Sequence, residues 1–216
     1  MVATEAQTAA LVELFHKGTR LTYKKGEFII RPGETPPGIF YISVGLVKAF
    51  DITKYGEENL LIIRKVHEIF PLIWAITGQE RNVIYQALTQ TEGWRLDRKQ
   101  YLKYIEEHNE VLGPLLDMTV EMYRIHSERI INLEYWTVRE RLISFLLTMS
   151  VRFGRKTDAG TVIDVPLKQQ DIASSINASR ETTSRELTGL ERKGLIINAG
   201  QPLITLKDIK KLRAYL

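Results

Sequence analysis

The chain has 216 residues, 44% of them hydrophobic and 26% charged, with a formal net charge of +4, and this length suits two domains. The absence of cysteine excludes disulfides, thiolate zinc sites and cysteine-ligated iron–sulfur clusters. No stretch reaches the roughly 18 consecutive apolar residues of a membrane span, and the N-terminus lacks signal-peptide features, so we expect a soluble, cytoplasmic protein.

Charge is distributed unevenly along the chain. Residues 138–216 carry 14 Lys plus Arg against 8 Asp plus Glu, whereas residues 1–137 carry 16 against 18. A basic C-terminal part suits a polyanionic partner. Many basic domains bind no nucleic acid, so this indication needs support from a motif.

The N-terminal half begins with a short predicted helix and continues as strands. Leu11, Leu14 and Phe15 lie at helical spacing within residues 1–18. Residues 19–96 then alternate short β-rich runs with Gly, Pro and polar turns, which predicts an antiparallel roll or barrel with room for a ligand in its mouth. The runs are EFIIR, IFYISV, LVKAFDI, NLLIIRKV, NVIYQALT and EGWRLD.

One piece of this region, KKGEFIIRPGETPPGIFYISVGLVKAF at residues 24–50, is more specific. Gly26, Gly33, Gly38 and Gly45 fall between strands, where a tight turn can require a positive φ. Any tight β-meander shares such spacing. The whole string, however, resembles the signature of cyclic-nucleotide-binding domains.

Residues 100–153 read as helical for much longer than a usual globular helix. Seven residues there follow one another at alternating spacings of four and three, a short heptad seam that is apolar at its ends and partly polar in the middle, a pattern of contact between two helices. This seam consists of Leu112, Leu116, Thr119, Tyr123, His126, Ile130 and Leu133. We interpret it as a dimer contact, the alternative being one helix lying on its own barrel. Gly113-Pro114 marks the start of the long helix.

The C-terminal part has the order of elements of a winged helix. A Leu- and Ile-rich helix, RERLISFLLTMSVRF, is followed by a loop, GRKTDAGT, and a short strand, VIDVP. Two further predicted helices come next, and a hairpin turned at Ala199-Gly200 precedes a last helix.

The two helices before that hairpin form a predicted helix-turn-helix. PLKQQDIASSI puts Ile172, Ala173 and Ile176 on one face, and Ser179 is placed as the N-cap of the second helix after a turn at Asn177. In the second helix, three residues pack inward, namely Thr183, Leu187 and Leu190, and five form an outer stripe, namely Arg180, Glu181, Ser184, Arg185 and Thr188.

The outer stripe has two interpretations. A solvated helix often carries such alternating charges. Arginine, however, matches the paired acceptors of guanine, a carboxylate accepts from cytosine, and hydroxyls and amides at a helix start suit phosphates. The preceding helix and short turn favour a recognition helix in the DNA major groove.

The segment QQDIASSINASRETTSRELTGLERKGLI is similar to the helix-turn-helix of the Crp/Fnr superfamily of bacterial transcription regulators. The order of domains resembles that family over nearly the whole chain. The implied fold is α+β: a cyclic-nucleotide-binding-like β-roll at 1–106, a dimerisation helix at 107–137 and a winged helix-turn-helix DNA-binding domain at 138–216.

The resemblance also implies roles for single residues. Arg180, Glu181 and Arg185 match the base-reading residues of the cAMP-receptor type, which implies an inverted repeat with TGTGA-like half-sites. The residues implied near phosphates are Lys168, Gln170 and Ser179. Thr183 stands where the family usually has valine, and Asn177 where it often has glycine; both departures concern packing rather than base reading.

The predicted sensor departs further from the family. Its cAMP-binding members use a Gly-Glu pair for phosphate and ribose and an Arg-Ser pair to close the site. Pro71-Leu72 and Arg81-Asn82 stand at these positions, so the ribose carboxylate and one amide are absent and cAMP is disfavoured as effector. Glu80 is a candidate substitute for that carboxylate. The predicted effector pocket comprises Phe70, Pro71, Leu72, Arg81, Asn82, His126 and Ser127.

Three interpretations of that pocket stay open. It binds an apolar effector, it binds a haem through His67 or His126, or its own side chains fill it and no ligand is needed. A structural, hydrogen-bonding role is the default for both histidines. The cofactor is therefore unknown, and no iron–sulfur cluster is expected.

The predicted function is a homodimeric, sequence-specific DNA-binding transcription regulator, either controlled by an effector other than cAMP or independent of ligand. The predicted partners are double-stranded DNA, a second copy of the chain, RNA polymerase and a small-molecule effector, with no membrane. The alternative is a ligand-binding signalling module whose helical tail binds protein. No nucleophile motif, metal cluster or phosphate loop indicates an enzyme.

Overall fold

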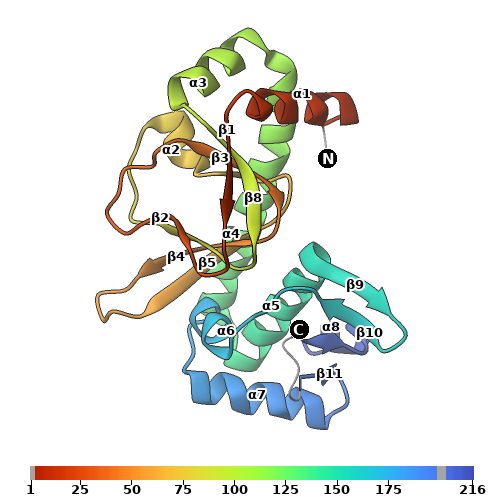
Figure 1. Cartoon of the computed structure of the whole chain (residues 1–216). Coiled ribbons are helices and arrows are strands. Elements are labelled where there is room, and N and C mark those ends of the chain that lie inside the picture. The colour runs from red at the N-terminus through yellow and green to blue at the C-terminus, as the bar shows by residue number, and fades with distance from the viewer. Residues whose placement is uncertain (1–2, 199–202) are drawn as a thin grey trace. The chain divides into compact units, whose positions relative to one another are not determined.

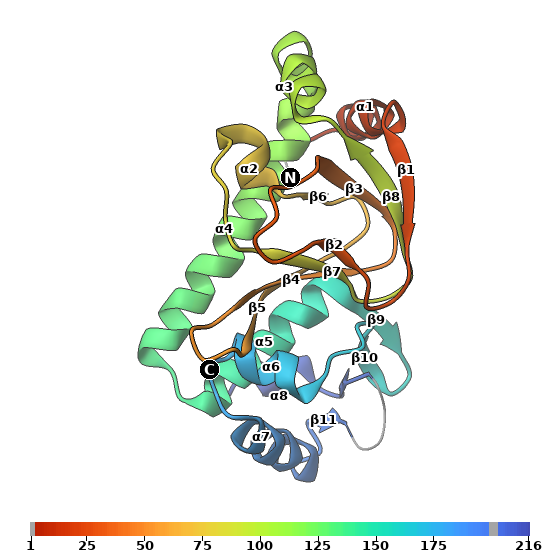
Figure 2. The same cartoon turned by 60° about the vertical axis from the view of Figure 1, so that its left-hand side comes forward.

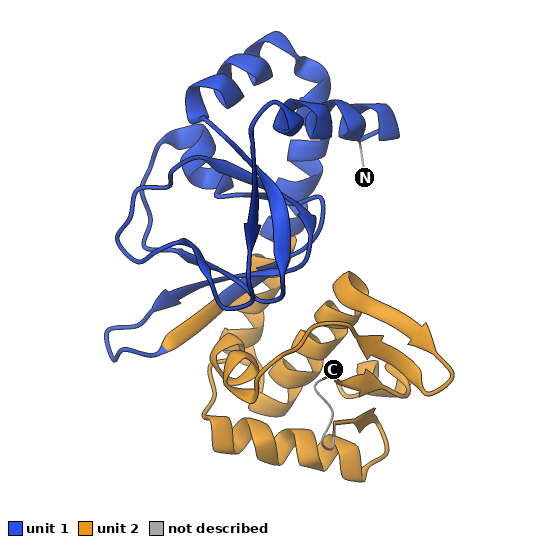
Figure 3. Ribbon diagram, viewed as in Figure 1, with its two compact units in different colours: residues 1–57, 61–123 blue, residues 58–60, 124–216 orange. Residues whose placement is uncertain are grey.

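The computed structural model describes residues 3–198 and 203–216 and divides into two compact units (Figure 3). Unit 1 comprises residues 1–57 and 61–123, and unit 2 comprises residues 58–60 and 124–216. The helices along the chain (Figure 1) are α1 (Glu5–His16), α2 (Leu72–Thr77), α3 (Arg98–Glu107), η1 (Asn109–Val111, a 3-10 turn), α4 (Leu112–Tyr135), α5 (Val138–Phe153), α6 (Gln169–Ser175), α7 (Arg180–Arg192) and α8 (Ile209–Arg213).

Antiparallel sheets form the body of unit 1, which confirms the predicted roll (Figure 2). One sheet has the strand order β1-β8-β3-β6 and the other β2-β7-β4-β5. The strands are β1 (Thr19–Tyr23), β2 (Phe28–Ile30), β3 (Ile39–Val44), β4 (Val47–Ile52), β5 (Glu58–Arg64), β6 (Ile69–Phe70), β7 (Ile84–Ala87) and β8 (Thr91–Leu96). The first three residues of β5 are grouped with unit 2.

The four glycines singled out between these strands all have positive φ, as predicted. Gly45 shows why, with φ of 91° in the turn between β3 and β4. A Cβ added there would collide with the carbonyl oxygen of Gln90. Both the backbone angle and the close approach therefore require glycine at this turn.

The core of unit 1 includes α1, as its spacing predicts. Leu11, Leu14 and Phe15 are buried, and the Phe15 ring stacks on Tyr41 of β3 with centroids 5.5 Å apart. Full burial of a large apolar side chain stabilises a fold by about 1.5–3 kcal/mol. The cluster also contains Ile39, Ile69, Ala75, Leu96, Tyr101, Val111 and Leu115. The N-terminal helix is thus an integral part of unit 1.

The long helical region is interrupted twice rather than continuous. His108 leaves helical geometry with φ of −132° and ψ of 78° between α3 and η1. Thr137 then begins α5 with a capping box to Glu140, which separates α5 from α4. Helix α4 starts at Leu112 with Pro114 in its first turn, as predicted. Along the described ranges, 3–198 and 203–216, no helix is long and apolar enough to cross a membrane.

Unit 2 is a winged helix-turn-helix that contains α5, α6 and α7 and a sheet of order β11-β12-β10-β9, with β9 and β10 between α5 and α6 in the chain. Its strands are β9 (Gly154–Thr157), β10 (Gly160–Ile163), β11 (Ile196–Ile197) and β12 (Thr205–Leu206). The segment GRKTDAGT, predicted as a loop, contains β9 and the start of β10, which pair antiparallel. The prediction was wrong because β9 is exposed on both faces and shows no alternation. The predicted turn at Ala199-Gly200 lies outside the described residues.

Candidate nucleic-acid interface and sensor pocket

The turn between α6 and α7 has the geometry of a helix-turn-helix. Asn177 adopts the left-handed conformation with φ of 49°, which asparagine tolerates better than most residues. The amide of Ala178 donates to the carbonyl of Ala173 at 3.0 Å. The guanidinium of Arg141 in α5 donates to the Asn177 carbonyl at 3.2 Å. The turn is therefore held from within and from the neighbouring helix.

The inner face of α7 is buried as predicted. Leu187 and Leu190 are 0% and 1% exposed, and Thr183 is 0% exposed. The Thr183 hydroxyl donates to the Ser179 carbonyl at 2.9 Å, so its polar group is satisfied within the helix. Threonine can thus occupy this packed position without leaving an unpaired hydroxyl.

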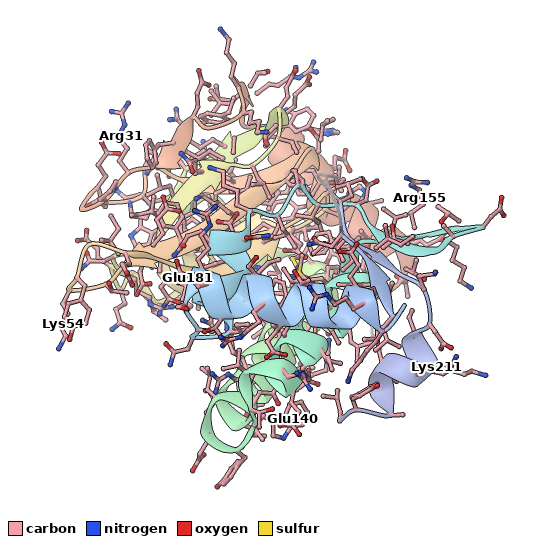
Figure 4. The ribbon with its side chains drawn as sticks, turned by 90° about the horizontal axis from the view of Figure 1, so that it is seen from below. Arg31, Lys54, Glu140, Arg155, Glu181 and Lys211 are labelled. Atoms are coloured by element: carbon pink, nitrogen blue, oxygen red, sulfur yellow. The ribbon has the colours of Figure 1, made fainter. Side chains whose placement is uncertain are left out.

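The outer face of α7 carries the predicted polar stripe. Arg180, Glu181, Arg185 and Thr188 are exposed, and Ser184 is partly exposed. Figure 4 shows Glu181 at the N-terminal end of α7. Two cationic side chains and one anionic side chain are therefore presented from the first turns of one helix.

Local hydrogen bonds define the start of α7. The Ser179 hydroxyl accepts from the Thr182 amide at 3.1 Å, which confirms the predicted N-cap. The Glu181 carboxylate accepts from its own backbone amide and from Ser179, and these bonds, aided by the Arg180 charge, lower its pKa. Glu181 is therefore anionic at neutral pH and able to accept a hydrogen bond.

An ion pair that the sequence analysis missed anchors α7 to α5. The Nε atom of Arg139 donates to the Glu186 carboxylate at 2.7 Å, and this contact raises the pKa of Arg139. Glu186 lies on α7 next to Arg185 of the outer stripe. No local pattern could reveal the pair, because its members lie 47 residues apart in the chain.

The residues predicted near phosphates lie at the starts of the two helices. Lys168, Gln170 and Ser179 are all exposed. The Lys168 amide donates to Asp171 at 3.0 Å, which fixes the beginning of α6. Two further exposed cations, Arg155 and Lys156, lie on β9 and were not predicted as site residues; Figure 4 labels Arg155.

The sensor cassette in unit 1 has a proline and a leucine where the sequence analysis expects a Gly-Glu pair in cAMP-binding relatives. Pro71 is buried, offers no N–H, and begins the six-residue helix α2 without a side-chain cap. Leu72 follows it as the first residue of α2, so the ribose position has no carboxylate. The substitute considered, Glu80, accepts a hydrogen bond from the Thr35 hydroxyl. Phe70 is buried and stacks on Tyr85 with centroids 4.6 Å apart.

Unit 1 nevertheless contains a large pocket, of about 850 Å³. Its lining residues come from α1, β5, α2, β7, α3 and α4: Gln7, Arg64, Leu72, Ile73, Ile76, Thr77, Tyr85, Ile105, Leu112, Gly113, Leu115, Leu116, Thr119 and Met122. Of the predicted pocket residues, only Leu72 is among them. Arg81 and Asn82 are exposed, Phe70 is in the core, and His126 and Ser127 belong to unit 2. Sequence reasoning missed Arg64 and Tyr85.

His67, one of the two histidines considered as haem ligands, makes a hydrogen bond. Its Nδ1 atom contacts the hydroxyl of Tyr41. The backbone at His67 is left-handed, with φ of 70°. Among residues 3–198 and 203–216, no cluster of three or more His, Cys, Asp or Glu side chains is arranged to hold a metal ion. His67 therefore has a hydrogen-bond partner, Tyr41, which supports a structural role for this histidine.

Comparison with known proteins identifies both halves of the chain. Residues 20–108 match the cyclic nucleotide-binding domain family, and residues 140–215 match the Crp-like helix-turn-helix domain family. The chain belongs to the Crp/Fnr family of transcription regulators. As in other members of that family, the helix-turn-helix is a DNA-binding module, and the proteins it resembles are regulators rather than enzymes.

Alignments with individual relatives extend over most of this Crp/Fnr family chain. A global nitrogen regulator from Synechocystis sp. is 28% identical over 194 residues, which is 87% of this chain and 84% of the relative. The cAMP-activated global transcriptional regulator CRP from Salmonella typhimurium is 26% identical over 94% of this chain and 98% of its own length. The structure of FixK2 from Bradyrhizobium japonicum has a TM-score of 0.78 at 23% identity, covering 91% and 96% of the two chains, and supports the same fold.

Proposed function

We propose that this regulator acts as a homodimer that reads an inverted repeat of TGTGA-like half-sites and responds to an effector other than cAMP. The observation that carries the proposal is the outer stripe of α7, a set of exposed charged side chains over a fully buried inner face. This helix follows a tight turn after α6, the arrangement that places a recognition helix in a major groove.

Each reading residue has a matching base edge. Arg180 and Arg185 offer forked donors to the O6 and N7 acceptors of guanine, and the Glu181 carboxylate accepts from the cytosine amino group. One good pair of this kind contributes about 1–3 kcal/mol of discrimination. Lys168, Gln170 and Ser179 contact phosphates, which fix the register without reading sequence.

Exposed apolar side chains on α4 support the homodimer. Leu116, Tyr123 and Ile130 of the predicted seam are 53%, 75% and 64% exposed. A second copy of the same helix would cover these side chains in an isologous contact. The dimer would then present two recognition helices about 34 Å apart, the spacing of successive major grooves.

Control would come through unit 1. An effector that binds one dimer arrangement better than another shifts the population towards it, and so changes the spacing of the two recognition helices. In this proposal residues 1–106 sense, residues 107–137 dimerise and residues 138–216 bind DNA. RNA polymerase is the protein partner that we expect at the promoter, in the cytoplasm.

The experiment is fluorescence anisotropy on a duplex with an inverted TGTGA-like repeat, compared with a scrambled duplex of equal composition. Arg180→Ala combined with Arg185→Ala should abolish the preference for the repeat, a loss of about 100-fold or more for two discriminating pairs. Arg213→Ala, which removes an exposed arginine of unit 2 outside the helix-turn-helix, is the control and should keep the preference.

Two results would contradict the proposal. If the double variant still preferred the repeat, α7 would not be the reading helix. If wild-type binding to duplex DNA showed no steep decrease with salt, few phosphates would be contacted, and the protein-binding signalling module would become the better account.

A further inference from the structure

Arg64, at the end of β5, is a buried cation that the DNA-binding function does not use. Its side chain is only 10% exposed. A carboxylate oxygen of Glu68 lies 3.5 Å from a terminal nitrogen of Arg64, and the Nε atom of Arg64 has no hydrogen-bond partner among the described residues. Burying a guanidinium is costly unless its donors are satisfied, so this position has capacity for a further acceptor.

This guanidinium borders the 850 Å³ pocket of unit 1. The other walls are mainly apolar, with Ile73 and Ile76 of α2 on one side and Leu115 and Leu116 of α4 on another. Pockets of this size commonly enclose small organic molecules, with an apolar body and a few directed polar contacts.

The charges around the polar end of the pocket favour an anion. Tyr85 lines the pocket beside Arg64, and burial raises the pKa of its hydroxyl. The charges of Arg64 and Arg81 oppose that effect on the pKa, as does a hydrogen bond that Arg64 makes with the hydroxyl. Among the residues that line the pocket, Arg64 is the one charged side chain and there is no carboxylate, and the Tyr85 hydroxyl beside it is an additional donor.

We propose that this pocket binds a small organic acid with an apolar body. Its carboxylate would accept from the free Nε–H of Arg64 and from the Tyr85 hydroxyl, and its hydrocarbon part would lie between α2 and α4. The site differs from the predicted cassette, because Arg81 and Asn82 do not line it. Its role as the effector site depends on the proposed regulatory function, whereas the binding itself does not.

The test is isothermal titration calorimetry of the full chain, without DNA, using sodium octanoate and its uncharged analogue octanamide. Octanoate should bind at least ten times more tightly than octanamide, and each added methylene should tighten binding about fourfold until the pocket is full. Arg64→Met should remove the preference for the acid. Arg31→Met, which changes an exposed arginine of unit 1, should leave it intact.

A second pair of variants guards against loss of folding in Arg64→Met. Ile76 lines the pocket but is 50% exposed, so a charge there is compatible with the fold. Ile76→Glu should weaken octanoate binding and Ile76→Lys should strengthen it, while octanamide binding changes little with the sign of the charge. Equal binding of acid and amide by the wild type, no binding of either, or a shift in the same direction in both variants would overturn the proposal.

Failure of this proposal is distinguishable from failure of the regulatory one. Calorimetry reports the pocket without DNA, and anisotropy reports α7 without an organic acid. Octanoate binding with no preference for the DNA repeat would refute only the proposed function. A clear DNA preference with no octanoate binding would refute only the organic-acid site.

Discussion

Helix α7 and the pocket of unit 1 present their functional side chains in opposite ways. In α7, the residues proposed to read DNA are exposed neighbours on one helix, and the residues beneath them are buried. In the pocket, the lining side chains come from six elements, and the one cation among them is buried. The proposed DNA-reading surface is therefore formed by one continuous helix with a regular spacing. The pocket, in contrast, is formed by residues more than a hundred positions apart in the chain.

The largest effect should come from the buried side of α7. Leu187→Ala removes a side chain that is 0% exposed and should lower the free energy of unfolding by about 2–5 kcal/mol. Urea denaturation followed by circular dichroism measures the change. Thr188→Ala, an exposed neighbour, is the control and should change stability by less than about 0.5 kcal/mol. Similar losses in both variants would contradict the division of α7 into two faces.

A smaller effect is expected at the turn before α7. Asn177→Val places a β-branched residue at φ of 49° and should destabilise the protein by about 1–3 kcal/mol. Asn177→Gly, which has no such conflict, should remain close to wild type. Thermal unfolding of the two variants provides the measurement, and a glycine variant as unstable as the valine variant would show that the Asn177 side chain, not its backbone, matters.

The smallest effect concerns acid. Hydrogen bonds from the Thr137 side chain and backbone lower the pKa of Glu140 in the capping box of α5. Because the folded pKa is depressed, this contribution to stability is complete above the ordinary value near 4.5 and is lost as the pH falls through the folded pKa. Glu140→Gln should therefore flatten the fall in stability below about pH 4.5, measured as melting temperature against pH. An unchanged profile would exclude this carboxylate as a source of acid sensitivity.

Most of unit 2 could be predicted because its signals are local. The N-cap serine, the left-handed asparagine and the inward spacing of Thr183 and Leu187 are each visible within about four residues, one turn of helix. Strand β9 escaped prediction because all its side chains are exposed and only backbone pairing with β10 defines it. The Arg139–Glu186 ion pair escaped because its partners are distant in sequence.

In unit 1, less of the candidate site could be predicted from the sequence. Its roll and its glycine turns follow from sequence, yet the predicted pocket residues share only Leu72 with the observed pocket. Arg64 ends the run NLLIIR, where a charged residue is ordinarily taken as the exposed end of a strand. It is nevertheless buried, and it lines a pocket whose other walls include residues of α2 and α4. Whether a side chain at the end of a strand is buried depends on segments distant in the chain and not on the local sequence.

Side chains shared by the pocket and the seam on α4 would link the response to the ligand with the amount of protein in the cell. Leu112, Leu116 and Thr119 line the cavity and also belong to the seam on α4. Under the proposed dimer, association and ligand binding use the same side chains, and any effect of one on the affinity of the other must be matched by an equal factor in return. The concentration at which a cell responds to the ligand would then depend on how many copies of the regulator it makes. Abundance of the protein would set the threshold of its own signal.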